Sequence, residues 1–365
     1  MVKYVVVVAI LVIVFMIINL PVFGGSIKGK RLERMKKSPH YRDGVFQNLS
    51  PTPSVTEGFT MRQVLWDFLT DKTPHKVPDH KIPSIKTDLK SQSKKDDFLV
   101  WMGHSSYYLQ TDGVRFLVDP VFSGNASPIP GTTKAFAGSD IYSADDFPMI
   151  DYLIISHDHY DHLDYKTIMS LRTKIEKVIC GLGVGAHLER WGFAGNQIVE
   201  LDWYESANLN PDIKITSTPA RHFSGRLFRR NTTLWSSFVL RTATKNIFIG
   251  GDSGYDSHFK TIGERFGPFD VAILENGQYN EKWRYIHTLP EEFGKVVNDL
   301  GAKNVLPVHS GKFSLAQHPW DEPLKKVKEY SVGKNFRLCT PMIGEKMSLD
   351  DDRQQFSEWW TKKKG

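Results

Sequence analysis

Residues 156–165, "SHDHYDHLDY", place three histidines and three aspartates within eight positions, from His157 to Asp164. The stretch follows the apolar run "YLIIS" at residues 152–156, which predicts a buried strand. Four side chains fill the pattern H-x-H-x-D-H, namely His157, His159, Asp161 and His162. Histidine nitrogens and carboxylate oxygens bind Zn²⁺ at roughly 2.0–2.2 Å. A solvated polar turn is the alternative, but three histidines at this spacing beside an apolar strand favour a metal site.

The loop holds more potential ligands than one catalytic zinc needs. An open catalytic site takes three protein groups and water, so four ligands are enough to begin two metal sites. Three further residues follow predicted strands in the same way, namely His222, Asp252 and His309. Each alone is a weak signal, because a single histidine or aspartate after a strand is more often structural. The repeated placement predicts a site built from loops at one edge of the sheets.

The composition is that of a globular protein, with 40% hydrophobic and 24% charged residues in a chain of 365. Two cysteines, Cys180 and Cys339, cannot make a disulfide framework, and neither lies in a C-x-x-C motif. The net charge of +6 suits an anionic partner such as nucleic acid or a membrane surface. Charge alone says little about fold or chemistry.

The N-terminus is apolar, with no charged residue between Lys3 and Lys28. Residues 4–23 give twenty mostly apolar positions, about the ~20 that a membrane-spanning helix needs. A cleavable signal peptide is the alternative, since residues 24–26 are small. Six cations follow the apolar run, and positive flanks stay in the cytoplasm. We therefore expect a single membrane anchor at residues 1–25 with a cytoplasmic catalytic domain; export is the alternative.

Short apolar runs separated by turns begin at Phe98 and predict strands. The runs are "FLVWMG", "VRFLVD", "YLIIS", "KVIC", "IKITSTP", "WSSFVLRT", "NIFIGGD", "DVAILE" and "NVLPVH". Helices are expected after Asp164, which is placed to cap one, at residues 185–191, after Thr288 and at residues 323–330. Mixed strands and helices of this kind predict an α/β protein with sheets covered by helices.

The order of H-x-H-x-D-H, His222, Asp252 and His309 resembles the metallo-β-lactamase fold. "DPVFSGNASP", "SHDHYDHLDY", "ELDWYE" and "GDSGY…FGPFD" resemble the branch of N-acylphosphatidylethanolamine-hydrolysing phospholipase D. "WMGHSSYYLQTDGVRFLVDP" is similar to the lactonase-like branch as well. The resemblance implies an αβ/βα sandwich over residues 96–345. A membrane segment at 1–25, a basic proline-rich arm at 26–95 and a C-terminal tail at 346–365 would flank it.

The resemblance also implies two Zn²⁺ ions and a role for each site residue. His157, His159 and His222 would bind the first ion, and Asp161, His162 and His309 the second, with Asp252 bridging them. Asp161 would also help to hold the nucleophile, and His287 would contact phosphate or assist the leaving group. His104 and Asp119 would orient ligand imidazoles. Tyr279 is a weaker candidate near the site.

The leading prediction is a dizinc phosphodiesterase that cleaves a phospholipid, with hydroxide generated by the two ions attacking phosphorus. The alternative is a hydrolase of a small soluble phosphorylated lactone or ester, and an apolar rather than polar pocket would favour the lipid. Nuclease activity ranks lower, so no nucleic acid is expected. A metal-binding scaffold without activity ranks last, because all seven ligand positions are filled. The oligomeric state stays open.

Overall fold

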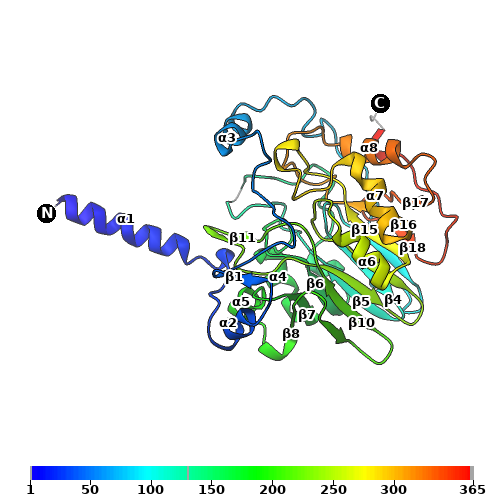
Figure 1. Cartoon of the computed structure of the whole chain (residues 1–365), viewed down its shortest axis with the longest axis horizontal. Coiled ribbons are helices and arrows are strands. Elements are labelled where there is room, and N and C mark those ends of the chain that lie inside the picture. The colour runs from blue at the N-terminus through cyan, green and yellow to red at the C-terminus, as the bar shows by residue number, and fades with distance from the viewer. Residues whose placement is uncertain (1, 130, 362–365) are drawn as a thin grey trace.

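The computed structural model describes residues 2–129 and 131–361, and it is built around two facing seven-stranded sheets (Figure 1). The first sheet has the order β18-β3-β4-β5-β6-β7-β8. Its strands are β3 (Phe98–Trp101), β4 (Tyr107–Thr111), β5 (Val114–Val118), β6 (Ile150–Ile155), β7 (Ile175–Gly181), β8 (Ile198–Leu201) and β18 (Lys346–Ser348). Strands β5 to β8 run parallel, and the others pair antiparallel.

The second sheet has the order β17-β16-β15-β14-β13-β10-β9. Its strands are β9 (Ser206–Asn208), β10 (Lys214–Thr218), β13 (Ser237–Arg241), β14 (Asn246–Ile249), β15 (Phe269–Glu275), β16 (Ala302–Val308) and β17 (Arg337–Leu338). Strands β14 to β17 run parallel, and β9, β10 and β13 extend the sheet antiparallel.

The alternation of side chains along each strand explains why the sheets are covered on both faces. On β6, Ile154 faces the core between the sheets, whereas Leu153 and Ile155 face the outer layer. The outer layers hold α4 (Tyr165–Leu171) and α5 (Gly185–Arg190) on the first sheet. On the second sheet they hold α6 (His258–Phe266), α7 (Pro290–Leu300) and α8 (Glu322–Ser331). Strands buried on both faces need the unbroken apolar runs seen in the sequence.

The predicted αβ/βα sandwich is confirmed, and so is the α/β class. All nine predicted apolar runs form strands, and helices form at the four predicted places. Asp164 caps α4, since its carboxylate accepts hydrogen bonds from the backbone N–H groups of Lys166 and Thr167. Within the sandwich, the sequence did not predict α6 or the strands β4, β8, β9, β17 and β18.

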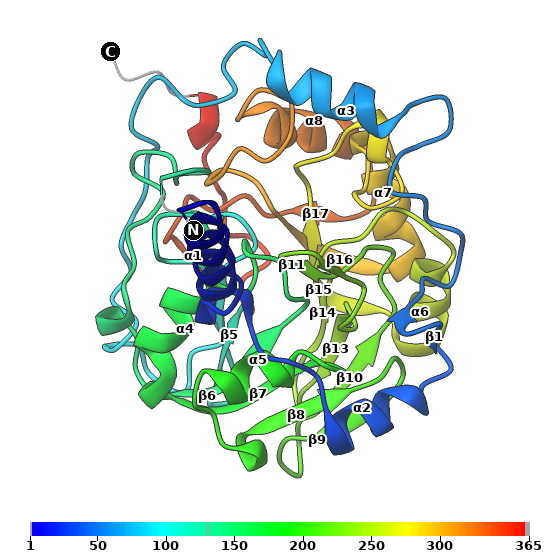
Figure 2. The same ribbon diagram turned by 90° about the vertical axis from the view of Figure 1, so that its left-hand side faces the viewer.

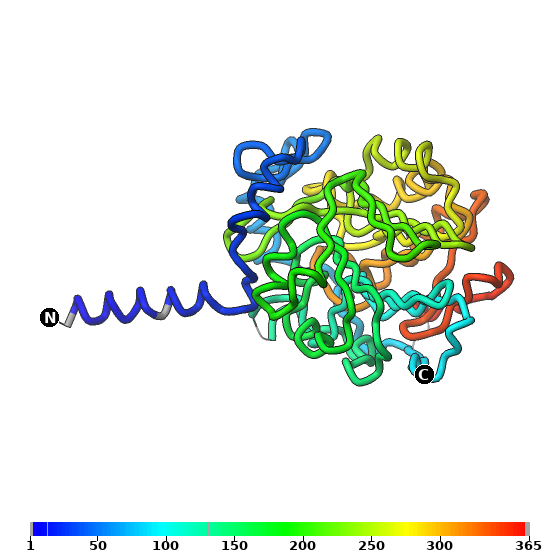
Figure 3. Tube along the Cα trace, turned by 90° about the horizontal axis from the view of Figure 1, so that it is seen from below, coloured from blue at the N-terminus to red at the C-terminus, as the bar shows by residue number. Residues whose placement is uncertain are grey.

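The apolar N-terminus forms α1 (Val2–Ile18), which projects from the body of the molecule (Figures 1 and 3). Its 17 residues rise about 25 Å at 1.5 Å each, less than the ~30 Å of a bilayer core. The helix ends before Pro21 opens the 3-10 turn Pro21–Phe23. No helix in the described part of the chain is long and apolar enough to cross a membrane. This finding overturns the predicted membrane-spanning segment and the membrane-anchored localisation inferred from it.

Residues 26–95 lie on the surface of the sandwich as a chain of short elements. These are α2 (Gly29–Lys36), β1 (Tyr41–Arg42), β2 (Val45–Phe46) and α3 (Met61–Leu69), and Figure 2 shows α2 and α3 at opposite ends of one face. Arg31 of α2 pairs with Glu189 and Glu200, each at 2.7 Å. Phe46 is buried against Trp203 and Trp235. At the other end of the chain, Trp359 is buried in the core between the sheets.

Candidate metal centre

The seven predicted ligand residues meet where loops leave one edge of the sandwich. The loop that carries His157, His159, Asp161 and His162 follows β6 of the first sheet. His222, Asp252 and His309 follow β10, β14 and β16 of the second sheet. The site is therefore assembled from both sheets.

Three residues at this edge have left-handed backbone conformations, with φ of 53° at His104, 42° at Asp119 and 67° at His309. Such values are uncommon for residues other than glycine. They persist where the surrounding structure enforces them, which is frequent at functional sites.

One group of ligand atoms is formed by three imidazoles. Nδ1 of His159 lies 2.9 Å from Nε2 of His157 and 3.3 Å from Nε2 of His222. Nitrogens bound to one tetrahedral Zn²⁺ at 2.0–2.1 Å lie about 3.3 Å apart. The spacing of this group therefore fits a single ion.

A second group lies beside the first, and Asp252 lies between them. His162, Asp161, His309 and His104 offer ligand atoms that all lie within 4.8 Å of one another. Oδ2 of Asp252 is 3.1 Å from Nε2 of His162 and 3.8 Å from Nε2 of His222. One carboxylate is thus close to both groups.

The hydrogen bonding of the cluster also fits a bound cation. Nε2 of His162 and Oδ1 of Asp252 are buried, and although they lie 3.1 Å from Oδ2 of Asp252 and 3.2 Å from Nδ1 of His309, respectively, neither makes a well-directed hydrogen bond among the described residues. Buried polar atoms are almost always partnered, so such atoms need an explanation. Imidazole nitrogens and carboxylate oxygens together form a donor set suited to zinc.

Burial and mutual proximity shift the pKa values of the ligand side chains. Burial lowers the pKa of His157, His222 and His309 well below the usual value, and that of His159 to about 4. These four imidazoles are therefore neutral at pH 7, as metal ligands must be.

The pKa of His162 is shifted in the other direction. Burial opposes its protonation, but the carboxylates of Asp252 and Asp161 raise its pKa well above normal. For Asp161, burial would raise the pKa, but His162 and a hydrogen bond from His104 hold it well below the usual range. A cation bound between these groups would take the place of the His162 proton.

The two predicted orienting residues contact the ligands directly. Nε2 of His104 lies 2.9 Å from Oδ2 of Asp161, and Oδ2 of Asp119 lies 2.8 Å from Nδ1 of His162. Asp119 also accepts a hydrogen bond from the backbone N–H of Ser156. Ser105, which the sequence did not single out, lies 2.8 Å from Nδ1 of His309.

His287 lies in the same pocket, with its ring 5.1 Å from that of His222 and 5.2 Å from that of His309. Its Nδ1 is 2.6 Å from Oε2 of Glu275. Glu275 is buried, and burial raises its pKa well above normal. Glu275 was not predicted from the sequence as a site residue, although it ends the predicted strand "DVAILE" just as other site residues follow theirs.

The structure does not bring Tyr279 to the cluster. Its hydroxyl donates a hydrogen bond to Glu322 at 3.0 Å, and its ring stacks on His318 at 4.8 Å. These residues line a separate pocket.

Five of the candidate ligands line a cavity of about 250 Å³, namely His159, Asp161, His222, Asp252 and His309. Beyond these histidines and carboxylates, the lining is mostly apolar, with Phe68, Phe223, Trp283, Ile286 and Leu315 beside the polar Ser54 and Gln278. Phe68 comes from α3, and its ring stacks on Trp283 with centroids 5.7 Å apart. Part of the N-terminal arm therefore helps to form the site.

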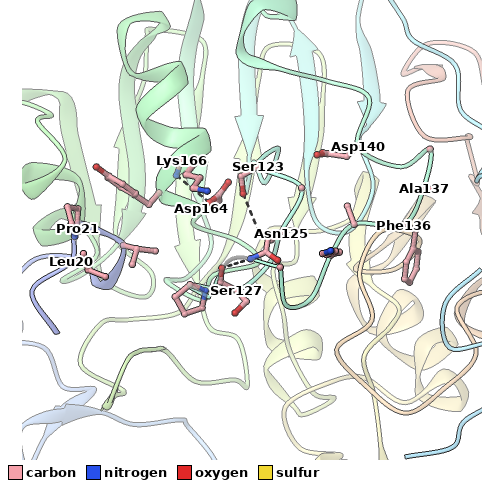
Figure 4. A pocket seen from close by; sticks show the side chains of 18 residues that line it. Leu20, Pro21, Ser123, Asn125, Ser127, Phe136, Ala137, Asp140, Asp164 and Lys166 are labelled. Carbon is pink, nitrogen blue, oxygen red and sulfur yellow. Dashed lines mark hydrogen bonds between the residues drawn. The ribbon is translucent and has the colours of Figure 1, made fainter. Parts of the chain in front are cut away.

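A larger cavity, of about 640 Å³, lies between residues 20–22 and the loop of residues 123–140 (Figure 4). Its described lining includes no histidine or cysteine. Its carboxylates are engaged elsewhere, because Asp140 pairs with Lys312 and Asp164 caps α4. Candidate metal ligands line the smaller cavity.

A family model described as the beta-lactamase superfamily domain matches residues 114–310, more than half of the chain. The chain belongs to this superfamily. Among its relatives is N-acyl-phosphatidylethanolamine-hydrolyzing phospholipase D 1 of Caenorhabditis elegans. The two are 32% identical over 78% of this chain and 84% of that protein.

Two further similarities extend the comparison. An uncharacterized protein of Mycobacterium tuberculosis is 36% identical over 89% of this chain and 88% of its own length. A metallo hydrolase from the archaeon Ignicoccus hospitalis has the same fold, with a TM-score of 0.52 and 21% identity. That match covers 69% of this chain and 98% of the archaeal chain.

Proposed function

We propose that this chain is a dizinc phosphodiesterase that cleaves a phospholipid between phosphate and headgroup, with N-acylphosphatidylethanolamine as the preferred class. The observation that carries the proposal is the pairing of a buried histidine–aspartate cluster with an apolar cavity wall. The 32% identity to the nematode phospholipase supports it.

In this proposal, His157, His159 and His222 hold one zinc ion, and Asp161, His162 and His309 hold the other. Asp252 would be a ligand of both ions, because its carboxylate lies close to both His162 and His222. When bound, the pair of ions supplies Lewis acidity toward water and toward the phosphoryl oxygens. The protein supplies the fixed orientation of the ligands through His104, Asp119 and Ser105.

His287 is proposed to contact the phosphate or the leaving oxygen. Its Nδ1 is engaged by Glu275, so Nε2 is the atom left for substrate. Glu275 is itself held by a 2.6 Å hydrogen bond from the backbone N–H of Thr288. Substrate approaching through the pocket therefore meets an imidazole of fixed orientation.

The shape of the cavity favours a lipid over a small polar ester. A volume of about 250 Å³ accommodates a phosphodiester at the floor but not two acyl chains. The chains would leave across Phe68, Phe223 and Trp283, where apolar surface replaces water. A phosphorylated lactone would bury little apolar surface against these residues and would therefore gain little binding free energy from them.

The test uses the full-length, zinc-loaded chain with N-acylphosphatidylethanolamine in mixed micelles. Mass spectrometry should detect phosphatidic acid and N-acylethanolamine from the wild type and from the control His80→Gln, a histidine outside the site. Asp161→Ala should bind less zinc and form neither product.

Cleavage of an aryl phosphodiester without cleavage of the lipid would reject the lipid and favour the small soluble substrate. Lipid hydrolysis that persists after complete removal of metal would reject the dizinc proposal itself.

A further inference from the structure

The loop of residues 156–164, here called the metal-binding loop because it carries four of the proposed ligands, is bound by one buried arginine. Arg226, on strand β11 (Gly225–Arg226), is 2% exposed. Its Nη1 donates to the carbonyls of Asp158 at 2.7 Å and Leu163 at 2.9 Å, which lie within and just after the ligand pattern. Its Nε and Nη2 donate to the carbonyl of Val22 at 3.1 and 2.6 Å. One guanidinium therefore joins the metal-binding loop to the segment that follows α1.

A second connection runs through Asp158, the residue between two proposed ligands. Its carboxylate accepts hydrogen bonds from the backbone N–H of Gly225 at 2.7 Å and the hydroxyl of Thr233 at 2.9 Å. Nε2 of His187 lies 3.2 Å from the same carboxylate. Nδ1 of His187 accepts a hydrogen bond from the backbone N–H of Gly25 at 2.9 Å, so its Nε2 carries the proton and donates to Asp158.

The segment of residues 20–25 is fixed along its length. Arg190 donates to the carbonyl of Gly24 at 2.7 Å, and the Trp191 indole donates to that of Pro21 at 2.8 Å. A Cβ on Gly24 would lie 2.1 Å from Nδ1 of His187, and one on Gly25 would lie 1.9 Å from the carbonyl oxygen of Ala186. This close approach requires glycine at both positions, and φ of 78° at Gly24 favours it as well.

We propose that residues 20–25 form a brace for the metal centre, with Arg226 and His187 as positioning residues that connect the brace to the metal-binding loop. The inference rests on the proposed dizinc site. The loop carries four of the seven proposed ligands, so a shift of the loop changes the surroundings of both ions at once. Figure 1 shows β11 beside the end of α1 that joins the body of the molecule.

The brace gives residues 24 and 25 a role in packing. In the sequence they could be read as the small residues of a processing site. In the structure they are buried against α5 and Ala186, and their carbonyls accept hydrogen bonds from the domain.

The experiment compares zinc release by full-length variants below their unfolding temperatures. The variants are Arg226→Gln, His187→Gln and Gly25→Ala. The matched control is Arg31→Gln, which removes two ion pairs between the N-terminal arm and the domain without touching the metal-binding loop. A chromogenic chelator reports the release rate, and the visible spectrum of the Co²⁺-substituted protein reports ligand geometry.

The three variants should release zinc about 10–100-fold faster than the wild type, the range typical for loss of residues that support metal ligands. Their Co²⁺ spectra should change, and the control should match the wild type in both measurements. Should Arg226→Gln fail to fold, Gly25→Ala and His187→Gln decide the question. Wild-type release rates and spectra in the folded variants would overturn the brace alone. A wild-type protein that binds no zinc would overturn the proposed function as well.

Discussion

Three imidazoles of the metal centre are oriented through their second ring nitrogen. Nδ1 of His162 contacts Asp119, Nδ1 of His222 contacts the Ile286 carbonyl, and Nδ1 of His309 contacts Ser105. Such contacts select the tautomer and leave Nε2 free to bind metal. The residues around the ligands therefore carry part of the specificity of the site.

Asp119→Asn tests this reading at a single residue. The amide has one acceptor oxygen where the carboxylate has two, so the contacts with His162 and Ser156 cannot both be kept. Zinc affinity, measured by competition with a chelator, should fall about 10–100-fold. Asp112→Asn, in the turn before the same strand β5, should leave the affinity unchanged. Wild-type zinc affinity in Asp119→Asn would show that Asp119 does not support the metal ligands.

The lowered pKa of Asp158 should make the unfolding free energy of the metal-free protein depend on pH. Burial would raise its pKa, but the hydrogen bond from His187 and the nearby positive charge of Arg226 lower it from 3.8 to about 2. A carboxyl group whose pKa is lower in the folded than in the unfolded protein stabilises the folded protein at pH values above its unfolded-state pKa. This stabilisation is lost as the pH falls through the folded-state pKa. The contribution is roughly 2 kcal/mol at pH 7, since one pKa unit is about 1.4 kcal/mol.

Denaturant unfolding of the wild type and Asp158→Asn at pH 2–7 measures this contribution. The difference in unfolding free energy should be constant above about pH 5 and should shrink between about pH 4 and pH 2. A difference that does not change over that range would show that Asp158 titrates normally in the folded protein.

Short elements next to the site position its side chains, and α4 is one of them. It starts directly after the metal-binding loop, and Asp164 satisfies its first N–H groups. Asp164→Ala should reduce the unfolding free energy by about 1 kcal/mol, the usual cost of losing an N-cap. Asp321→Ala is the control, because Asp321 precedes α8 without a capping hydrogen bond from its side chain. Equal losses in both variants would argue against a capping role for Asp164.

Helix α3 contributes Phe68 to the cavity wall and exposes other apolar residues to solvent. Phe68→Ala removes a stacked ring pair, worth about 1 kcal/mol. KM for the lipid should rise about five-fold, while turnover of a small aryl phosphodiester should stay the same. Leu69→Ala, a change on the same helix at an 80% exposed position, should alter neither value. A similar loss on both substrates would show that Phe68 supports the cluster and not the acyl chains.

At the scale of the whole molecule, the metal centre joins the two sheets. Four proposed ligands come from a loop of the first sheet, and His222, Asp252 and His309 come from loops of the second. Bound ions would cross-link the halves of the sandwich. They would also satisfy buried atoms that the described residues leave without partners.

Removal of metal should therefore lower global stability. Zinc at a thousand times its Kd adds about 4 kcal/mol to the unfolding free energy, if the unfolded chain does not bind it. Calorimetry should show a lower Tm after chelation and recovery on adding Zn²⁺. Ca²⁺, which prefers oxygen ligands, should not restore the Tm. An unchanged Tm after complete metal removal would show that the cluster does not link the sheets.

Local pattern was enough to predict nine of the strands and the metal-binding loop. Apolar runs such as "YLIIS" can be buried in only a few ways, and the ligand pattern within 157–162 depends on a spacing inside one turn. The recurrence of a ligand-type residue after a strand predicted where His222, Asp252 and His309 would lie. Glu275 followed the same rule, but a single glutamate at a strand end carries little signal by itself.

The sequence by itself therefore predicted nine strands, the α/β class and the side chains that gather at one edge, because short-range periodicity and spacing encode them; the resemblance to the metallo-β-lactamase fold added the αβ/βα sandwich. Only the tertiary structure showed how long the N-terminal helix is and which residues bind the segment that follows it. The apolar stretch of residues 4–23 belongs to the helix Val2–Ile18 only as far as Ile18. The residues after Leu20 are held by Arg226, 204 positions away from Val22. Contacts over such separations depend on how the folded chain returns on itself, and no local pattern records them.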